Sequence, residues 1–137
     1  MLLRPVDPIG VYNRWDWFRA GIQKAIDRTG AHMRPEDVYL RVRTGTAWAY
    51  VIEADEDIGF IVTTVEHDPD GAVMFIWCLW CERGKLNQHK AAFYEALDGL
   101  AGSINAKRVR GWSPRKGYQW FDYVKPVATI YERELGG

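Results

Sequence analysis

The run AVMFIWCLWC at residues 72–81 is the longest apolar stretch of the sequence, and it decides the fold. Ten residues are too few for a helix that crosses a bilayer. The five residues before it, HDPDG at 67–71, place Pro and Gly as a tight turn requires. The run therefore predicts a strand that is entered through a hairpin, is buried on both faces and lies at the centre of a sheet.

The segments around this strand alternate between strand and helix patterns. Before it we expect a first strand at residues 2–6, helices at 11–28 and 34–45, and strands at 46–54 and 58–66. After it we expect a helix at 87–101 with Asn87 as its N-cap, a strand at 106–111, a turn or short helix at 113–122 and a last strand at 127–134.

The predicted order is β-α-α-β-β-β-α-β-(α)-β, which is an α/β (α+β) arrangement in one domain, residues 1–137. Three antiparallel strands followed by a helical crossover give a mixed sheet. The strand at 72–81 would then pair antiparallel on one side and parallel on the other.

This order resembles the GNAT (acetyl-CoA N-acyltransferase) fold. The segments that carry the resemblance are MLLRPV at 1–6, AVMFIWCLWC at 72–81, ERGK at 82–85, RVRGWSPRKGYQWF at 108–121 and VATIYEREL at 127–135. The Gly-Trp and Gly-Tyr pairs at 111–118 are similar to those of short GNAT-like proteins of tailed bacteriophages. The resemblance is strongest from residue 46 onward and implies acetyl-CoA as the donor of an acyl group.

The loop before the second half of the fold departs from the family pattern. GNAT proteins hold the acetyl-CoA pyrophosphate with a Gln/Arg-x-x-Gly-x-Gly/Ala loop, whose bare amides point at the anion. Here residues 81–87 contain one glycine, Leu86 stands where a small residue is expected, and Glu82 adds a negative charge. If acetyl-CoA binds, the resemblance implies Arg83, Gly84 and Lys85 as its ligands.

The general acid also departs from the family pattern. Many GNAT proteins carry a Tyr at the position of Ser113, and a Ser hydroxyl is a poor acid toward a thiolate. Tyr118 and Tyr123 are the candidate substitutes. An acceptor amine would approach near Glu66 or Tyr118.

The cysteines and histidines do not indicate a redox or metal site. Residues 77–81, WCLWC, are similar to the Trp-Cys-x-x-Cys of thioredoxins, but Cys78 lies inside the strand instead of at a helix start. We expect Cys78 to be buried and unbonded to Cys81, because their side chains point to opposite faces. The three histidines form no second ligand pair, so no metal is expected.

Lys+Arg and Asp+Glu number 18 each, so the formal net charge is zero. The protein therefore has no overall positive potential that would attract the phosphate backbone of a nucleic acid. A local basic cluster remains around Trp112, made of Lys107, Arg108, Arg110, Arg115 and Lys116. It either contacts phosphates or forms a solvated sheet edge. We favour the solvated edge and expect neither nucleic acid nor a membrane as partner.

The chain has seven Trp and seven Tyr, which are many for its length. Either they form a core rich in aromatics, which we favour, or some of them face a partner protein. Trp15 and Trp17 are two apart on a helix and should not both face the core. Interface anchors are expected among Trp15, Trp17, Trp48, Trp112 and Trp120.

The departures from the family pattern and the aromatic surplus lead to two hypotheses. The first is a catalytically degenerate GNAT-like phage protein that acts through contacts with virion or host proteins, as part of an oligomer or assembly, in the host cytoplasm or the virion. Under this hypothesis no cofactor is expected. The alternative is an active acetyl-CoA-dependent N-acyltransferase, with acetyl-CoA as its cofactor.

Overall fold

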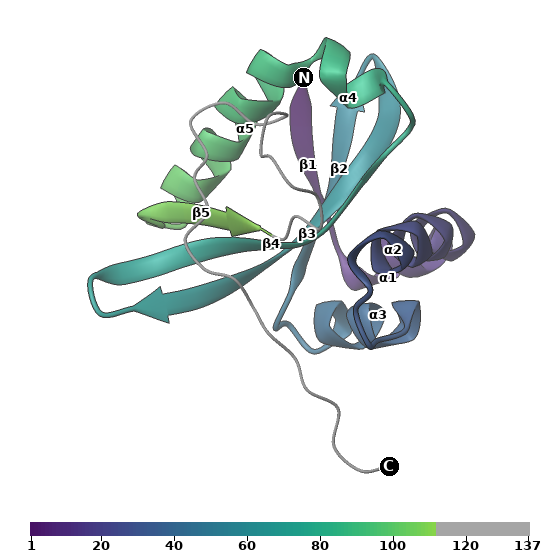
Figure 1. The fold of residues 1–137 in the computed structure, drawn as a ribbon, viewed down its shortest axis with the longest axis horizontal. Coiled ribbons are helices and arrows are strands. Elements are labelled where there is room, and N and C mark those ends of the chain that lie inside the picture. Colours follow the sequence, from purple (N-terminus) through teal and green to yellow (C-terminus); the bar gives the residue numbers. More distant parts are fainter. Residues whose placement is uncertain (112–137) are drawn as a thin grey trace.

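The computed structural model describes residues 1–111, so expectations for residues 112–137 lie outside the described residues. Its sheet has five strands in the order β1-β2-β3-β4-β5 (Figure 1). The strands are β1 (Leu2–Val6), β2 (Trp48–Ala54), β3 (Glu56–Asp68), β4 (Gly71–Cys81) and β5 (Arg108–Gly111). The helices are α1 (Pro8–Asn13), α2 (Trp15–Thr29), α3 (Pro35–Arg43), α4 (Lys85–Gln88) and α5 (Lys90–Ser103).

Strand β4 has the mixed pairing that the sequence predicts. It runs antiparallel to β3 and parallel to β5, which is reached through α4 and α5. Among the described strands β3 lies in the middle, and residues 58–64 of β3 form an unbroken buried run. The described part of β5 pairs with residues 73–76 of β4. Because the strand predicted at 127–134 lies outside the described residues, the central place of β4 in the sheet stays a prediction.

The predicted helix at 11–28 is two helices, which meet at Arg14 with φ −119° and ψ 32°. The first begins earlier than expected because Asp7 caps it: its Oδ1 accepts a hydrogen bond from the Gly10 N–H at 2.7 Å, with Pro8 at the first helical position. The predicted helix at 87–101 is likewise divided into α4 and α5 at His89. Asn87 lies inside α4, so its prediction as N-cap was wrong.

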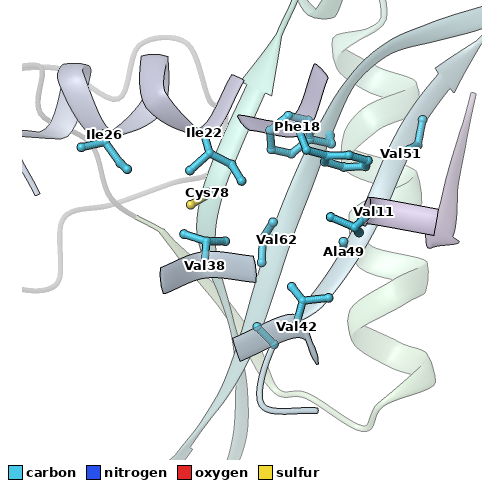
Figure 2. Packing of buried hydrophobic residues seen from close by; sticks show 12 residues of the cluster. Val11, Phe18, Ile22, Ile26, Val38, Val42, Ala49, Val51, Val62 and Cys78 are labelled. Atoms are coloured by element: carbon cyan, nitrogen blue, oxygen red, sulfur yellow. The ribbon is translucent and has the colours of Figure 1, made fainter. Parts of the chain in front are cut away.

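The sheet is covered on both faces (Figure 1). Helices α1, α2 and α3 pack on one face around a cluster that includes Phe18, Ile22 and Val38 (Figure 2). Helix α5 packs on the other face, where Phe93 and Leu97 meet Ile61 and Met74. Within residues 1–111, no helix is both long enough and apolar enough to span a membrane.

A β-bulge interrupts β4 at Trp77. Thr63 of β3 pairs with Ile76, but the preceding residue Val62 pairs with Cys78, which leaves Trp77 as the extra residue. The bulge reverses the alternation of the strand. Met74 and Ile76 face α5, whereas Cys78 packs in the cluster beneath α2. The bulge follows directly after the last residue of β4 that pairs with β5.

Candidate functional site

Beyond the bulge, one edge of β4 is open. Within the described residues, no strand pairs with residues 77–81 on the side that faces away from β3. The Glu82 N–H donates to the Ile58 carbonyl of β3 at 2.8 Å. Because successive residues of a strand direct their backbone groups to opposite sides, the N–H and C=O of Leu79 and Cys81 point away from β3. We call residues 77–81 on this side the open edge.

A hollow of about 630 Å³ lies beside the open edge. Its lining comes from three segments that are far apart in the sequence: Lys24 and Arg28 of α2, Trp80 and Cys81 of β4, and Glu82 and Arg83 of the following loop. Sequence analysis identified Arg83 but missed Lys24 and Arg28. Their only signal is a pair of cations one helical turn apart, beside the apolar stripe of α2.

Two glycines allow close packing beside the hollow, one between α2 and the sheet and one between β3 and β4. A Cβ on Gly21 of α2 would lie 2.5 Å from Cε1 of Phe60 and 2.9 Å from Cδ2 of Trp80. A Cβ on Gly59 of β3 would run into the Trp80 carbonyl oxygen and lie 2.7 Å from Cα of Cys81. Both sites therefore exclude a side chain, and α2 rests directly on the rings beneath it.

Trp80 is the aromatic wall of the hollow. Its ring contacts Trp17 edge-on, with centroids 5.6 Å apart, and contacts Phe60 at 5.8 Å. The Lys24 ammonium lies 5.7 Å from the Trp80 ring centroid, within the range of a cation–π interaction. On the outer side of Trp17, the Arg14 guanidinium stacks at 4.1 Å from the ring centroid. The position of the Trp80 ring is thus fixed by contacts with Trp17, Phe60 and Lys24.

The cations of the hollow differ in their partners. Within residues 1–111, Lys24, Arg28 and Arg83 form no ion pair. Lys85, by contrast, contacts Glu56 and lies 3.2 Å from Glu82. The hydrogen bonds from Lys85 to Glu56 and then Glu82 raise its pKa. Of the expected pyrophosphate ligands, Arg83 therefore lines the hollow, whereas Lys85 is ion-paired outside its lining.

The loop between β4 and α4 engages one of its own backbone amides in a turn. Gly84 precedes α4 with φ 78°, a left-handed conformation that suits glycine. The Lys85 N–H donates to the Glu82 carbonyl at 3.1 Å, so this amide is engaged inside the loop.

The cysteines behave as expected. Both are free thiols, and Cys78 is buried. Burial raises the pKa of Cys78 to about 12. Burial also raises the pKa of Cys81, although the backbone of Leu86 and Glu82 partly offsets this. Among residues 1–111, no group of three or more His, Cys, Asp or Glu side chains is placed to hold a metal ion.

Glu66 lies at the opposite end of β3 from the hollow. It is opposite Val73 in the ladder, and its carboxylate is 3.6 Å from Arg110. The structure therefore does not bring Glu66 to the open edge, and its role as a candidate near the acceptor amine stays a prediction. Tyr118 and Tyr123 lie outside the described residues.

Two of the three described cations of the basic cluster, Arg108 and Arg110, are ion-paired. Arg108 contacts Asp68 at 2.9 Å and Asp70 at 2.5 Å, and Arg110 contacts Asp68 at 2.6 Å. These pairs tie β5 to the hairpin between β3 and β4. This agrees with the interpretation as a charged sheet edge.

The tryptophans expected at an interface divide into three groups. Trp48 is 44% exposed. Trp15 and Trp17 are half-buried and both pack against the core, so the expectation that they cannot both face it was wrong. The reason is that α2 has neighbours on two sides: Trp17 packs on Phe60 of the sheet and Trp15 on Tyr39 of α3. Trp112 and Trp120 lie outside the described residues.

Comparison of the sequence finds no matching family model and no match among curated proteins. Solved structures do match. A ribosomal-protein-alanine N-acetyltransferase from Brucella melitensis biovar Abortus gives a TM-score of 0.68 at 12% identity, over 98% of this chain and 98% of that one. An aminoglycoside acetyltransferase from a soil metagenomic sample, in complex with sisomicin, gives 0.69 at 8% identity, over 98% and 95%. A probable acetyltransferase gives 0.62 at 15% identity, over 94% and 100%.

These matches show the fold. The chain has the α+β mixed sheet of the GNAT acetyltransferases, as its element order predicts. At such identities the likeness concerns the fold alone.

Proposed function

We propose that this protein is an acetyl-CoA-dependent N-acyltransferase that binds its acyl donor along the open edge of β4. Of the two hypotheses from the sequence, this one has the support of structural neighbours that are described as acetyltransferases. The bacteriophage setting and the loss of catalysis that we also considered have no such support.

The open edge is the observation that carries the proposal. Backbone groups of Leu79 and Cys81 point away from β3 and pair with no described strand. An unpaired strand edge binds extended ligands that carry amide groups, as if adding a strand. The pantetheine arm of acetyl-CoA is such a ligand, with two amides between its thioester and its phosphates. The hollow at the end of the edge gives space for the charged part of the donor.

The reaction would transfer the acetyl group from sulfur to an acceptor nitrogen. The amine attacks the thioester carbonyl, the carbon–sulfur bond breaks, the nitrogen loses a proton and the thiolate gains one. A strand edge with free N–H groups stabilises the oxygen that becomes negative during the attack. Tyr118 and Tyr123 stay candidates for the proton donor to the thiolate.

A proline substitution tests the role of the open edge. Leu79→Pro removes the outward N–H, whereas a ladder hydrogen bond to β3 is not expected from this residue. The control Leu79→Val keeps the N–H and a branched apolar side chain. The assay measures release of CoA thiol from acetyl-CoA with a panel of primary amines, including amino sugars and peptides with a free N-terminus.

We expect transfer by the unmodified protein and by Leu79→Val, and a loss of at least about tenfold in kcat/KM for Leu79→Pro. Circular dichroism must show that the proline variant is folded. Equal transfer by all three proteins would contradict the role of the edge. No transfer to any amine would contradict the proposed function.

A second candidate is a GNAT-fold protein that acts through protein contacts, in a virion or with a host protein. Exposed apolar side chains favour it, with Ile9 70%, Tyr12 67% and Trp48 44% exposed. Its test is light scattering of the unmodified protein and of Trp48→Ala. Self-association that the variant lacks would support this candidate, and a monomer at every concentration would weaken it.

A further inference from the structure

We infer that three side-chain cations hold the phosphate groups of the acyl donor. Two of them, Lys24 and Arg28, lie on helix α2, and the third, Arg83, lies in the loop that follows β4. This inference rests on the proposed function and specifies which groups recognise the donor. It assigns the anion to side chains from two distant segments instead of to the backbone amides of the loop alone.

Helix α2 presents two cations to the hollow without neutralising them. Lys24 and Arg28 are four residues apart, so their side chains lie one above the other on the same helix face. Like charges at this spacing destabilise a helix slightly. The nearest acid in sequence, Asp27, accepts a hydrogen bond from Gln23 at 2.9 Å and is not part of the lining. The two positive charges therefore remain available to an anion.

The loop contributes the third cation from the other side. Arg83 lines the hollow and forms no ion pair within residues 1–111. Among the described residues of the lining the one acid is Glu82, which lies 3.2 Å from the Lys85 ammonium. The described lining thus carries more positive than negative side chains, in a chain whose formal net charge is zero. This local field favours a ligand with several negative charges.

Two backbone donors of the loop are already engaged within the chain. The Glu82 N–H donates to Ile58 and the Lys85 N–H donates to Glu82. The Lys85 side chain is held by Glu56 and Glu82. Guanidinium groups bind phosphate oxygens in pairs, and a lysine adds a compact charge. Arg28, Arg83 and Lys24 therefore add charged donors to whatever amides of the loop reach the anion.

The experiment compares two ligands that differ in their phosphates. Calorimetry measures the Kd of CoA and of pantetheine, which lacks the nucleotide and its phosphates. The proteins are the unmodified chain, the double variant Lys24→Gln/Arg28→Gln, and the control Arg43→Gln. Arg43 is an exposed cation of α3 that is not part of the lining. Matching melting temperatures show that the variants are folded.

We expect the Kd of CoA to rise at least about tenfold in the double variant and to stay unchanged in the control. The Kd of pantetheine should be the same in all three proteins. Salt should weaken CoA binding to the unmodified chain more than to the double variant, because screening acts on the charges that the variant lacks.

Three results would overturn the inference: an unchanged Kd of CoA in the double variant, an equal loss for pantetheine and CoA, or no binding of CoA to the unmodified chain. The amine-transfer assay decides the proposed function separately. If the double variant still transfers acetyl groups to amines and binds CoA with an unchanged Kd, the cation site is rejected. The proposed transferase function then still stands.

Discussion

Cations cluster at both ends of β4, but the arginines at one end have acidic partners and the cations at the other end have none among the described residues. At the end that pairs with β5, Arg108 and Arg110 contact Asp68 and Asp70 of the hairpin. At the open end, Lys24, Arg28 and Arg83 form no ion pair within the described residues. The comparison teaches that basic residues close together in sequence need not mark a ligand site. The proposed donor site is distinguished by cations that converge in space without acidic partners among the described residues.

The two ends also differ in how their backbone is used. The paired end has β3 and β5 as neighbours, so its peptide groups are satisfied within the sheet. The open end has β3 alone among the described strands. One labelling experiment and three substitutions test this contrast, in order of decreasing expected effect.

The largest expected effect concerns the two thiols at the open end. Burial raises the pKa of Cys78 to about 12, so its reactive thiolate is scarce near neutral pH. Cys81 lines the hollow and should react faster. We expect iodoacetamide to label Cys81 first in the native protein and both cysteines after unfolding. Mass spectrometry of tryptic peptides measures this, and equal labelling rates in the native state would contradict the burial of Cys78.

The second largest effect should come from Gly59→Ala. The new Cβ meets the Trp80 carbonyl and Cα of Cys81, which are backbone atoms that cannot rotate away. We expect a loss of about 3 kcal/mol in the free energy of unfolding, measured with urea.

The control for this change is Gly99→Ala in α5, where a Cβ has nothing within 4 Å. Alanine is the better helix former, so this variant should gain up to about 1 kcal/mol. A Gly59→Ala variant as stable as the unmodified protein would show that β3 and β4 are not packed this closely at the open end.

A smaller effect is expected for the acid sensitivity of Asp57, which anchors the first residues of β3. Partial burial opposes its ionisation, but hydrogen bonds from Arg14 and Arg4 outweigh this and hold the pKa of Asp57 below its ordinary value. A carboxylate with a lowered folded-state pKa stabilises the fold above its unfolded pKa, and this contribution is lost as pH falls through the folded pKa.

We therefore expect Asp57→Asn to be less stable than the unmodified protein near neutral pH, and the gap to close as the pH falls below about 4. Thermal unfolding across this range measures it. A gap that stays constant with pH would show that charge on Asp57 is not the cause.

The smallest effect should come from the paired end. Arg108→Gln removes exposed contacts with Asp68 and Asp70, and exposed ion pairs contribute little. We expect a slight loss of stability that disappears in high salt, with the Kd of CoA unchanged. If this variant weakens CoA binding as much as the double variant of α2, the contrast between the two ends of β4 is wrong.

The sequence predicted the strand order well because the signals were local. The turn at Pro69 and Gly71 gave the hairpin, and one helical crossover gave the parallel pairing of β4 with β5. Helix boundaries were less certain, because Asp7 before Pro8 is compatible both with a strand end and with a helix cap. The break at His89 has no sequence signal of comparable strength.

The hollow could be predicted only in part. Arg83 follows β4 directly and was found through the family pattern of the loop. Lys24 and Arg28 are more than fifty residues away in sequence and reach the same space only because α2 crosses β4. The residue pattern of a helix does not predict which strand the helix will pack against. The contacts of Trp15 and Trp17 were mispredicted for the same reason, since the position of α3 beside α2 is a tertiary property.

The extra residue at Trp77 gives β4 two phases. Before it, even-numbered residues such as Met74 face α5, and after it, even-numbered residues such as Trp80 face α2. Loss of a single residue at this point would return the strand to one phase, with a regular ladder along its whole length. A single extra residue thus decides which side chains of β4 reach helix α2 and which reach α5.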